Sequence, residues 1–241
     1  MSNTTFLARW YKEFVLRRAY TTAKREPFFT LAGKFLPVQR NATVIDIGAA
    51  DGAFAHFLNL KERYPKLILL DQNPTNVSAL RLSFKYVERY HAPDRIPCED
   101  NSVQFIHLSH IVEHLSFQEL YVFLKECDRV LASAGILVIS TPLLWDRFYD
   151  DLSHVKPYNP EVFLHYLTRA KHDASAEAVS NSYVNRALVY RYRVIQGSEW
   201  GSKFFVIDCL IRCWRLVLSF LGFRRYVKNG YTLILEKNLS N

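Results

Sequence analysis

Two carboxylates in this sequence follow a pattern that suits the binding of a nucleoside. Asp46 lies in the apolar run 43–47 (TVIDI), and Asp71 ends a second apolar run at 67–71 (LILLD). Short apolar runs of this kind predict buried strands. An acid at the end of the second such strand can accept hydrogen bonds from both hydroxyl groups of a ribose. We therefore expect a nucleoside-binding crevice at this edge of a sheet.

The turn after the first run indicates which kind of nucleoside is bound. It reads GAADG, from Gly48 to Gly52, and its small residues let backbone and ligand approach closely. A dinucleotide fold usually has GxGxxG here, to admit a pyrophosphate. The Asp51 carboxylate would repel a pyrophosphate, whereas it suits a ligand that has an ammonium group and no phosphates. The turn therefore favours S-adenosylmethionine over NAD.

The elements that must position these residues are a parallel sheet and its covering helices. Predicted strands alternate with predicted helices up to residue 142, and each strand is almost wholly apolar, which is typical of parallel sheets covered on both faces. The expected strands lie at 43–47, 67–71, 103–108 and 136–140, and the expected helices at 53–63, 75–89 and 117–131. Ligands bind outside the carboxyl ends of such strands.

The remaining segments flank this core. Helices are expected at 4–25, 28–35, 160–170 and 204–221, and closing strands at 187–195 and 231–236. A length of 241 residues suits one domain. We therefore predict a single domain over 1–241, made of an N-terminal helical cap (1–37), a cofactor-binding core (38–142) and an acceptor-side part (143–241) with a loop, an amphipathic helix and closing strands.

Four segments of the chain resemble, in order and spacing, motifs of class I S-adenosylmethionine-dependent methyltransferases of the type 11/23 kind. They are the Asp-x-Gly-x-x-x-Gly turn at 46–52, LILLDQNP at 67–74, IPCEDNSVQFIHLSHIVEHL at 96–115 and RVLASAGILVISTP at 129–142. The resemblance implies an enzyme with S-adenosyl-L-methionine as its cofactor. It also implies an α/β fold with a Rossmann-like, doubly wound, mostly parallel seven-stranded sheet, flanking helices and an antiparallel last strand.

The resemblance also assigns residues to the cofactor. It places Asp94 in the adenine region, two residues beyond the position where many relatives have an acid, which here is nearest Ala92. The full set expected to bind the cofactor, with Asp51 from the turn chemistry above, is Asp46, Gly48, Ala50, Asp51, Gly52, Asp71, Gln72, Asp94, Ser109 and His110.

The segment DLSHVKPY at 151–158 follows the fourth predicted strand on the ligand-binding edge. It resembles an Asp-x-x-His-Val-Arg/Lys-x-Tyr element in a branch of this family, some of whose members act on glycans, lipid-linked acceptors or small molecules. A histidine can remove a hydroxyl proton near neutral pH. His154 and Tyr158 are thus the candidate catalytic residues, with methyl transfer to oxygen of such an acceptor; alternatively, both residues only brace the loop.

One short motif points to different chemistry. His110-Ile-Val-Glu-His114 matches HxxEH, in which two histidines one helical turn apart bind zinc. Here the match arises where a Ser-His pair ends a strand and the family's Glu-His pair begins the following helix. We therefore expect no metal site.

The four cysteines, Cys98, Cys127, Cys209 and Cys213, have no CxxC spacing, and no secretory signal is visible. Four buried thiols in a reducing compartment are expected. This predicts a cytoplasmic protein, peripheral to the membrane if its basic ends bind lipid.

The positive charge is concentrated at the two ends of the chain. Residues 1–40 hold eight lysines and arginines against two acids, and residues 186–241 hold ten against three, within a total net charge of +8. Such ends suit a membrane surface or a polyanion. One alternative function is therefore an RNA methyltransferase, although no Asn-Pro-Pro-Tyr-type motif or cysteine nucleophile follows the predicted strand 103–108. A second is a non-catalytic scaffold that keeps the fold.

The segment 203–222 is strongly apolar apart from a narrow stripe that contains Asp208, Arg212 and Arg215. A membrane-spanning helix would place these three charges in lipid at a cost of roughly 2.5–3.5 kcal/mol each. Three other arrangements stay open: burial in the domain, contact with a second copy of the chain, or a helix in the membrane interface with Arg224, Arg225 and Lys228 at head-group level.

Overall fold

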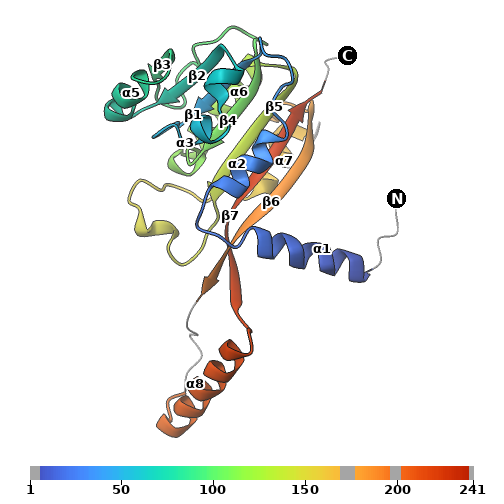
Figure 1. Cartoon of the computed structure of the whole chain (residues 1–241), viewed down its shortest axis with the longest axis vertical. Coiled ribbons are helices and arrows are strands. Elements are labelled where there is room, and N and C mark those ends of the chain that lie inside the picture. The colour runs from blue at the N-terminus through green and yellow to red at the C-terminus, as the bar shows by residue number, and fades with distance from the viewer. Residues whose placement is uncertain (1–5, 169–176, 196–201, 239–241) are drawn as a thin grey trace.

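The computed structural model describes residues 6–168, 177–195 and 202–238. Its centre is a seven-stranded sheet in the order β3-β2-β1-β4-β5-β7-β6 (Figure 1). The strands are β1 (Thr43–Ile47), β2 (Lys66–Asp71), β3 (Tyr86–Arg89), β4 (Val103–Ser109), β5 (Leu131–Pro142), β6 (Tyr183–Ile195) and β7 (Arg225–Lys237). β7 runs antiparallel to both of its neighbours, and the other pairings are parallel. The predicted fold class is thus confirmed.

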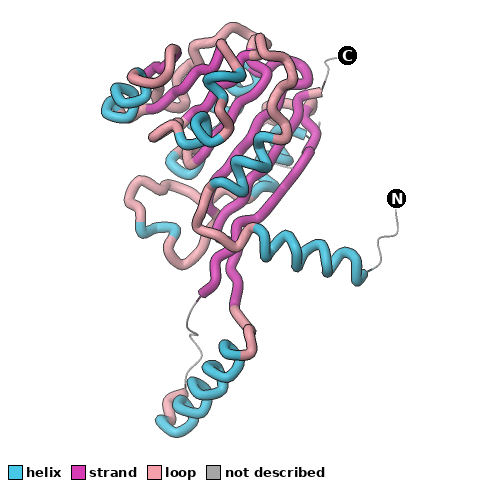
Figure 2. The backbone as a smooth tube through the Cα atoms, viewed as in Figure 1, coloured by secondary structure: helices cyan, strands magenta, loops and turns pink. Residues whose placement is uncertain are grey.

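Helices cover both faces of the sheet (Figure 2). On one face the core includes α2, α3, α4 and α5, and on the other it includes α6 and α7. The helices are α1 (Phe6–Ala19), α2 (Glu26–Gly33), α3 (Ala53–Phe57), α4 (Leu60–Arg63), α5 (Pro74–Arg81), α6 (Phe117–Val130), α7 (Pro160–Thr168) and α8 (Phe205–Phe220), with short 3-10 helices η1 (Val112–His114) and η2 (Phe148–Asp150).

Three predicted helices were wrong in extent. The helix expected at 4–25 ends at Ala19. The helix expected at 75–89 ends at Arg81, and its last residues form β3, an edge strand paired with β2. The helix expected at 53–63 is divided at Asn59, which has a left-handed φ of 51°. Asparagine tolerates that conformation better than most residues, so the chain breaks there into α3 and α4. The end of the helix predicted at 160–170 lies outside the described residues.

The strands that matter for binding end at one edge of the sheet. Ile47 pairs with Leu70 of β2 and with Leu108 of β4, and Ser109 pairs with Ser140 of β5. The carboxyl ends of β1, β2, β4 and β5 therefore meet, and the loops that follow them form what we call the carboxyl edge. This is where open α/β sheets bind ligands.

The strands β6 and β7 continue past this edge. The pairing of β7 with β5 stops at Gly230 opposite Pro142, whereas β6 and β7 stay paired as far as Ile195 and Arg225. The two strands leave the sheet as a narrow ribbon that carries α8 at its far end (Figures 1 and 2). We call the described residues 192–195 and 202–228 the ribbon arm.

Two further observations concern α8 and the thiols. None of the described helices combines the length and the apolar character that a membrane crossing requires. All four cysteines are free, but only Cys127 is buried, and Cys213 on α8 is exposed. The expectation of four buried thiols was therefore wrong: Cys98 lies half-buried before β4, and α8, which carries Cys209 and Cys213, has no buried residue.

Candidate active site

The turn between β1 and α3 has a backbone that most side chains would disturb. Gly48, Ala50 and Gly52 all have positive φ values, of 76°, 50° and 74°. A Cβ atom at position 48 would overlap the side chain of Ile111, and one at position 52 would lie 2.9 Å from a methyl carbon of Leu80. The glycines are thus required for the close approach of the turn to the carboxyl edge.

Asp71, at the end of β2, holds this turn in place. Its Oδ2 accepts a hydrogen bond from the Ala50 amide at 2.7 Å, and its Oδ1 accepts bonds from the Asn73 amide at 2.8 Å and from Asn76 Nδ2 at 3.1 Å. Asp71 is buried. A carboxylate has about four acceptor positions, so three internal donors leave one on Oδ2 for a ligand hydroxyl. Asp71 and the adjacent turn therefore fit the ribose of S-adenosylmethionine.

Asp46 differs from its predicted place. It is buried, and its Oδ1 lies 2.7 Å from His107 Nδ1, while the imidazole of His107 stacks on Phe54 with ring centroids 3.8 Å apart. Asp46 therefore points into the core on the α3 side, where its carboxylate is paired with His107. The prediction that it lines the cofactor directly was wrong.

The other residues assigned to the cofactor are at or beside the same turn and strand ends. The exposed Asp51 accepts a hydrogen bond from the Ala53 amide at 3.1 Å, at the start of α3. Gln72 and Asp94 are exposed. Among the described contacts, neither side chain makes a hydrogen bond. Ser109 ends β4, and its main-chain oxygen lies beside Gly48. Their roles toward the cofactor stay predictions.

Glu113 is the buried carboxylate of the site. Its Oε1 accepts a hydrogen bond from His110 Nδ1 at 2.9 Å, and its Oε2 accepts one from the Thr141 hydroxyl at 3.0 Å. Burial raises the pKa of Glu113, but the hydrogen bond and charge of His110 outweigh it, so that the pKa is lowered below its usual value. The carboxylate is thus held in its charged form.

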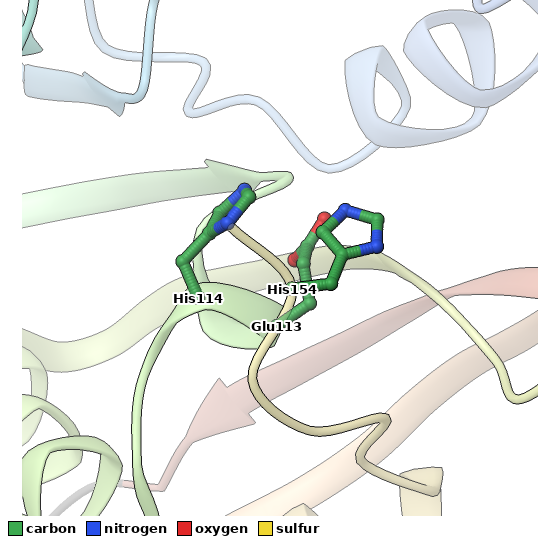
Figure 3. A group of neighbouring side chains, drawn as sticks. All are labelled: Glu113, His114 and His154. Carbon is green, nitrogen blue, oxygen red and sulfur yellow. The ribbon is translucent and has the colours of Figure 1, made fainter. Parts of the chain in front are cut away.

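Two histidines stand beside this carboxylate, one from η1 and one from the loop after β5 (Figure 3). His154 Nδ1 lies 2.7 Å from the Phe148 carbonyl oxygen, and His114 Nδ1 lies 3.0 Å from that of Ser153. Because a carbonyl oxygen only accepts, each Nδ1 carries the proton, and in the neutral ring each Nε2 holds the free lone pair. Both histidines therefore keep a basic nitrogen, and one ring nitrogen of each lies with a Glu113 oxygen in a group of atoms within 4.8 Å of one another.

The HxxEH residues do not adopt the zinc-binding arrangement of a helix. Residues 112–114 form a single 3-10 turn, and His110 lies before it with a φ of 57°. His110 therefore turns back to Glu113 instead of facing the same side as His114. Glu113, His114 and His154 could together approach a metal ion, but both oxygens of Glu113 already accept internal hydrogen bonds.

Tyr158 was predicted as a catalytic residue, and the structure corrects this. It is buried, its hydroxyl donates to the Leu115 carbonyl oxygen at 3.0 Å, and its own carbonyl oxygen accepts from the Tyr231 hydroxyl at 2.8 Å. Burial raises the pKa of Tyr158 to about 12. Its hydroxyl thus ties the loop after β5 to Leu115, which follows η1, and its carbonyl oxygen ties the same loop to β7.

Sequence reasoning missed one cation near this site. Arg191 of β6 places its guanidinium over the ring of Phe28, 4.9 Å from the centroid, and its Nε is buried without an acceptor among the described residues. Burial, together with the charge of Arg25, lowers the pKa of Arg191, and the charge of Glu113 acts in the opposite direction. An arginine in a mixed strand pattern such as ALVYRYRVI gives no signal of this burial.

The lowered pKa of Glu113 predicts a pH-dependent contribution to stability. We expect Glu113→Gln to cost about 2 kcal/mol at pH 7, where the charged hydrogen bonds are present. A carboxylate with a lowered folded-state pKa stabilises above its unfolded pKa and loses that effect as pH falls through the folded one. The gap in unfolding free energy between wild type and variant should therefore narrow below about pH 4.5. Denaturant titrations at pH 7 and pH 3.5 measure it, and an unchanged gap would contradict the assignment.

Comparison with known proteins agrees with this geometry. Residues 45–139 match the family model of the methyltransferase domain. Over 100 residues the chain is 32% identical to a probable S-adenosylmethionine-dependent methyltransferase of Mycobacterium tuberculosis strain H37Rv. That match covers 41% of this chain and 35% of the relative, so only about a third of the relative's length is matched.

Solved structures extend the similarity of fold to most of the chain. A SAM-dependent methyltransferase from Archaeoglobus fulgidus is 20% identical with a TM-score of 0.56, over 93% of this chain and 99% of that one. The YcgJ protein of Bacillus subtilis is 16% identical with a TM-score of 0.57, over 88% and 98% of the two chains. Residues 45–139 of this chain are thus similar to the methyltransferase domain, and the fold of the chain is similar to that of a solved SAM-dependent methyltransferase.

Proposed function

We propose that this protein transfers a methyl group from S-adenosylmethionine to a hydroxyl oxygen of a small-molecule, glycan or lipid-linked acceptor. The observation that carries the proposal is the state of His154. Its Nδ1–H is held by the Phe148 carbonyl oxygen, so its Nε2, 4.0 Å from Asp151 Oδ2, can accept a proton at the carboxyl edge. Tyr158 and Phe148 are both buried and fix the loop that presents it.

Methyl transfer asks little of the protein beyond alignment and removal of a proton. When bound, S-adenosylmethionine supplies a methyl group activated by its positive sulfur, and the carbon–sulfur bond breaks as the acceptor oxygen bonds to carbon, leaving the electron pair on sulfur. The hydroxyl proton passes to His154 Nε2. Asp71 and the Gly48–Gly52 turn hold the ribose and the methionine part of the cofactor.

The charge around the site favours an acceptor that carries an anionic group. Arg191 brings a guanidinium with an unused buried Nε to the same side of the molecule as Glu113. An arginine whose Nε is buried and has no acceptor among the described residues suits a carboxylate or phosphate oxygen. We infer that such a group on the acceptor lies beside Arg191.

The first test is calorimetric titration of the purified protein with S-adenosylmethionine and with its demethylated product. We expect both to bind with micromolar affinity, because Asp71 holds the turn through the Ala50 amide and keeps an acceptor position for the ribose. The absence of binding by either compound would overturn the enzyme proposal and support the scaffold alternative.

The second test is the transfer of a labelled methyl group from the cofactor to extracted lipids and glycans. This transfer should persist in the presence of EDTA, since His154 and not a metal activates the hydroxyl.

A further inference from the structure

The ribbon arm exposes an apolar surface that nothing in the described protein covers. No residue of α8 is buried. Phe205 and Phe220 are 82% and 92% exposed, and Leu216 is 71% exposed. Single exposed apolar side chains are ordinary, but a whole helix of them marks an interaction surface.

Most charged side chains of the ribbon arm are positive. Asp208 is paired with Arg212 at 2.6 Å. After α8 come Arg224 and, at the start of β7, Arg225 and Lys228, and residues 221–228 contain no acid. An apolar helix followed by a basic cluster suits the boundary of an anionic bilayer, where the helix enters the acyl region and the cations stay at the phosphates.

The N-terminal helix α1 joins the arm at its base. Tyr192 of β6 bridges to Thr21, and the Arg17 guanidinium lies 4.8 Å from the ring centroid of Tyr226. On α1, Trp10 and Tyr11 are 60% and 66% exposed. Aromatic residues beside arginines are typical of membrane interfaces.

The arm leaves the domain at the carboxyl edge, where the candidate active site lies. Past the Pro142–Gly230 pair the ribbon continues alone, and Arg193 on it lies 5.2 Å from the ring centroid of Trp145 in the loop that also carries His154. The tip of that loop exposes Leu152 fully. Docking through the arm would therefore turn the active-site edge toward the membrane.

We propose that the ribbon arm and α1 dock this protein on an anionic lipid bilayer, with α8 in the interface. A groove of about 1280 Å³ between α8 and the ribbon, lined in part by Val194, Ile195 and Trp214, gives lipid chains a place to pack. A second copy of the chain fits less well, because it would bring two basic clusters together. The docking rests on this surface alone and does not depend on the transfer chemistry.

The test is flotation of the full chain with vesicles of phosphatidylcholine, with and without 30% phosphatidylglycerol, at low and high salt. We expect binding to the anionic vesicles that weakens with salt. Leu216→Glu/Phe220→Glu should reduce it at least tenfold, because two charges would enter the apolar region. Arg224→Gln/Arg225→Gln/Lys228→Gln should reduce it about a hundredfold, since each cation near an anionic surface contributes roughly fivefold.

The matched control is Val38→Glu/Leu82→Glu, which adds the same charges at positions that are 93% and 90% exposed away from the arm. It should bind vesicles nearly as wild type. Equal loss in both double variants, or wild-type protein that stays unbound at low salt, overturns the proposal. Light scattering that shows a lipid-free dimer, which Leu216→Glu/Phe220→Glu dissociates, would also overturn it. A preference for RNA over vesicles in a competition experiment would do the same.

Discussion

Replacing Asp71 with alanine should weaken the binding of S-adenosylmethionine by at least about a hundredfold. Two effects act together. The variant loses the charged acceptor available to the ribose, and a hydrogen bond to a charged group contributes roughly 1.5–3 kcal/mol. It also releases the Ala50 amide, which Asp71 Oδ2 holds at 2.7 Å, so the Gly48–Gly52 turn loses its support. Calorimetric titration with the cofactor measures the change.

A neighbouring substitution gives the matched control. Asn76→Ala removes one donor to Asp71 Oδ1 and leaves the carboxylate and its bond to Ala50 intact. We expect it to change cofactor affinity only a few-fold. Far-UV circular dichroism and thermal unfolding should show that Asp71→Ala still folds. Cofactor affinity near wild type in folded Asp71→Ala would refute the role given to this residue.

Replacing His154 with alanine should lower kcat by about a hundredfold or more and leave the affinity for S-adenosylmethionine close to wild type. A positioned general base contributes 10²–10⁴-fold to a rate, and His154 touches none of the residues that hold the turn. The measurements are turnover with the accepted substrate and, separately, calorimetric titration with the cofactor.

His114→Ala is the matched variant for this experiment. His114 offers the same kind of free Nε2 in the same cluster, its ring centroid 5.1 Å from that of His154. If His154 is the base, His114→Ala should cost clearly less in kcat. A larger loss of kcat in His114→Ala than in His154→Ala would make His114 the base. Equal loss of cofactor affinity in both variants would mean that the two histidines only brace the loop.

The strongly patterned parts of the fold could be predicted from sequence. β1, β2 and β4 are nearly continuous apolar runs, and α6 has an amphipathic pattern with a capping box at Ser116 and Glu119. β3 could not be predicted, because four residues with three exposed side chains fit helical and strand periods equally well. β3 is a strand because it pairs with β2, and its own residues show no alternation that would reveal it.

At the site, sequence could name residues but not the directions of their side chains. Asp71 ends β2 and accepts a hydrogen bond from the Ala50 amide of the turn, whereas Asp46, one residue before the end of β1, is buried and meets His107 from β4. That contact joins residues 61 positions apart, so no local pattern predicts it. The same holds for Thr141 and Glu113, which are distant in sequence and are brought together by the register of β4 and β5.

The ribbon beyond Gly230 acts as a spacer whose length is set in whole residues. Four paired positions on β6, 192–195, extend it by about 13 Å at roughly 3.3 Å per residue. Because neighbouring strand residues face opposite sides, removing two residues from each strand would shorten the reach by about 7 Å and keep the orientation of α8, whereas removing one would turn the helix over. Insertions or deletions of two residues in each strand would thus change the distance between the carboxyl edge and α8 without turning α8 over. The length of the ribbon therefore sets how far from α8 an acceptor can be reached.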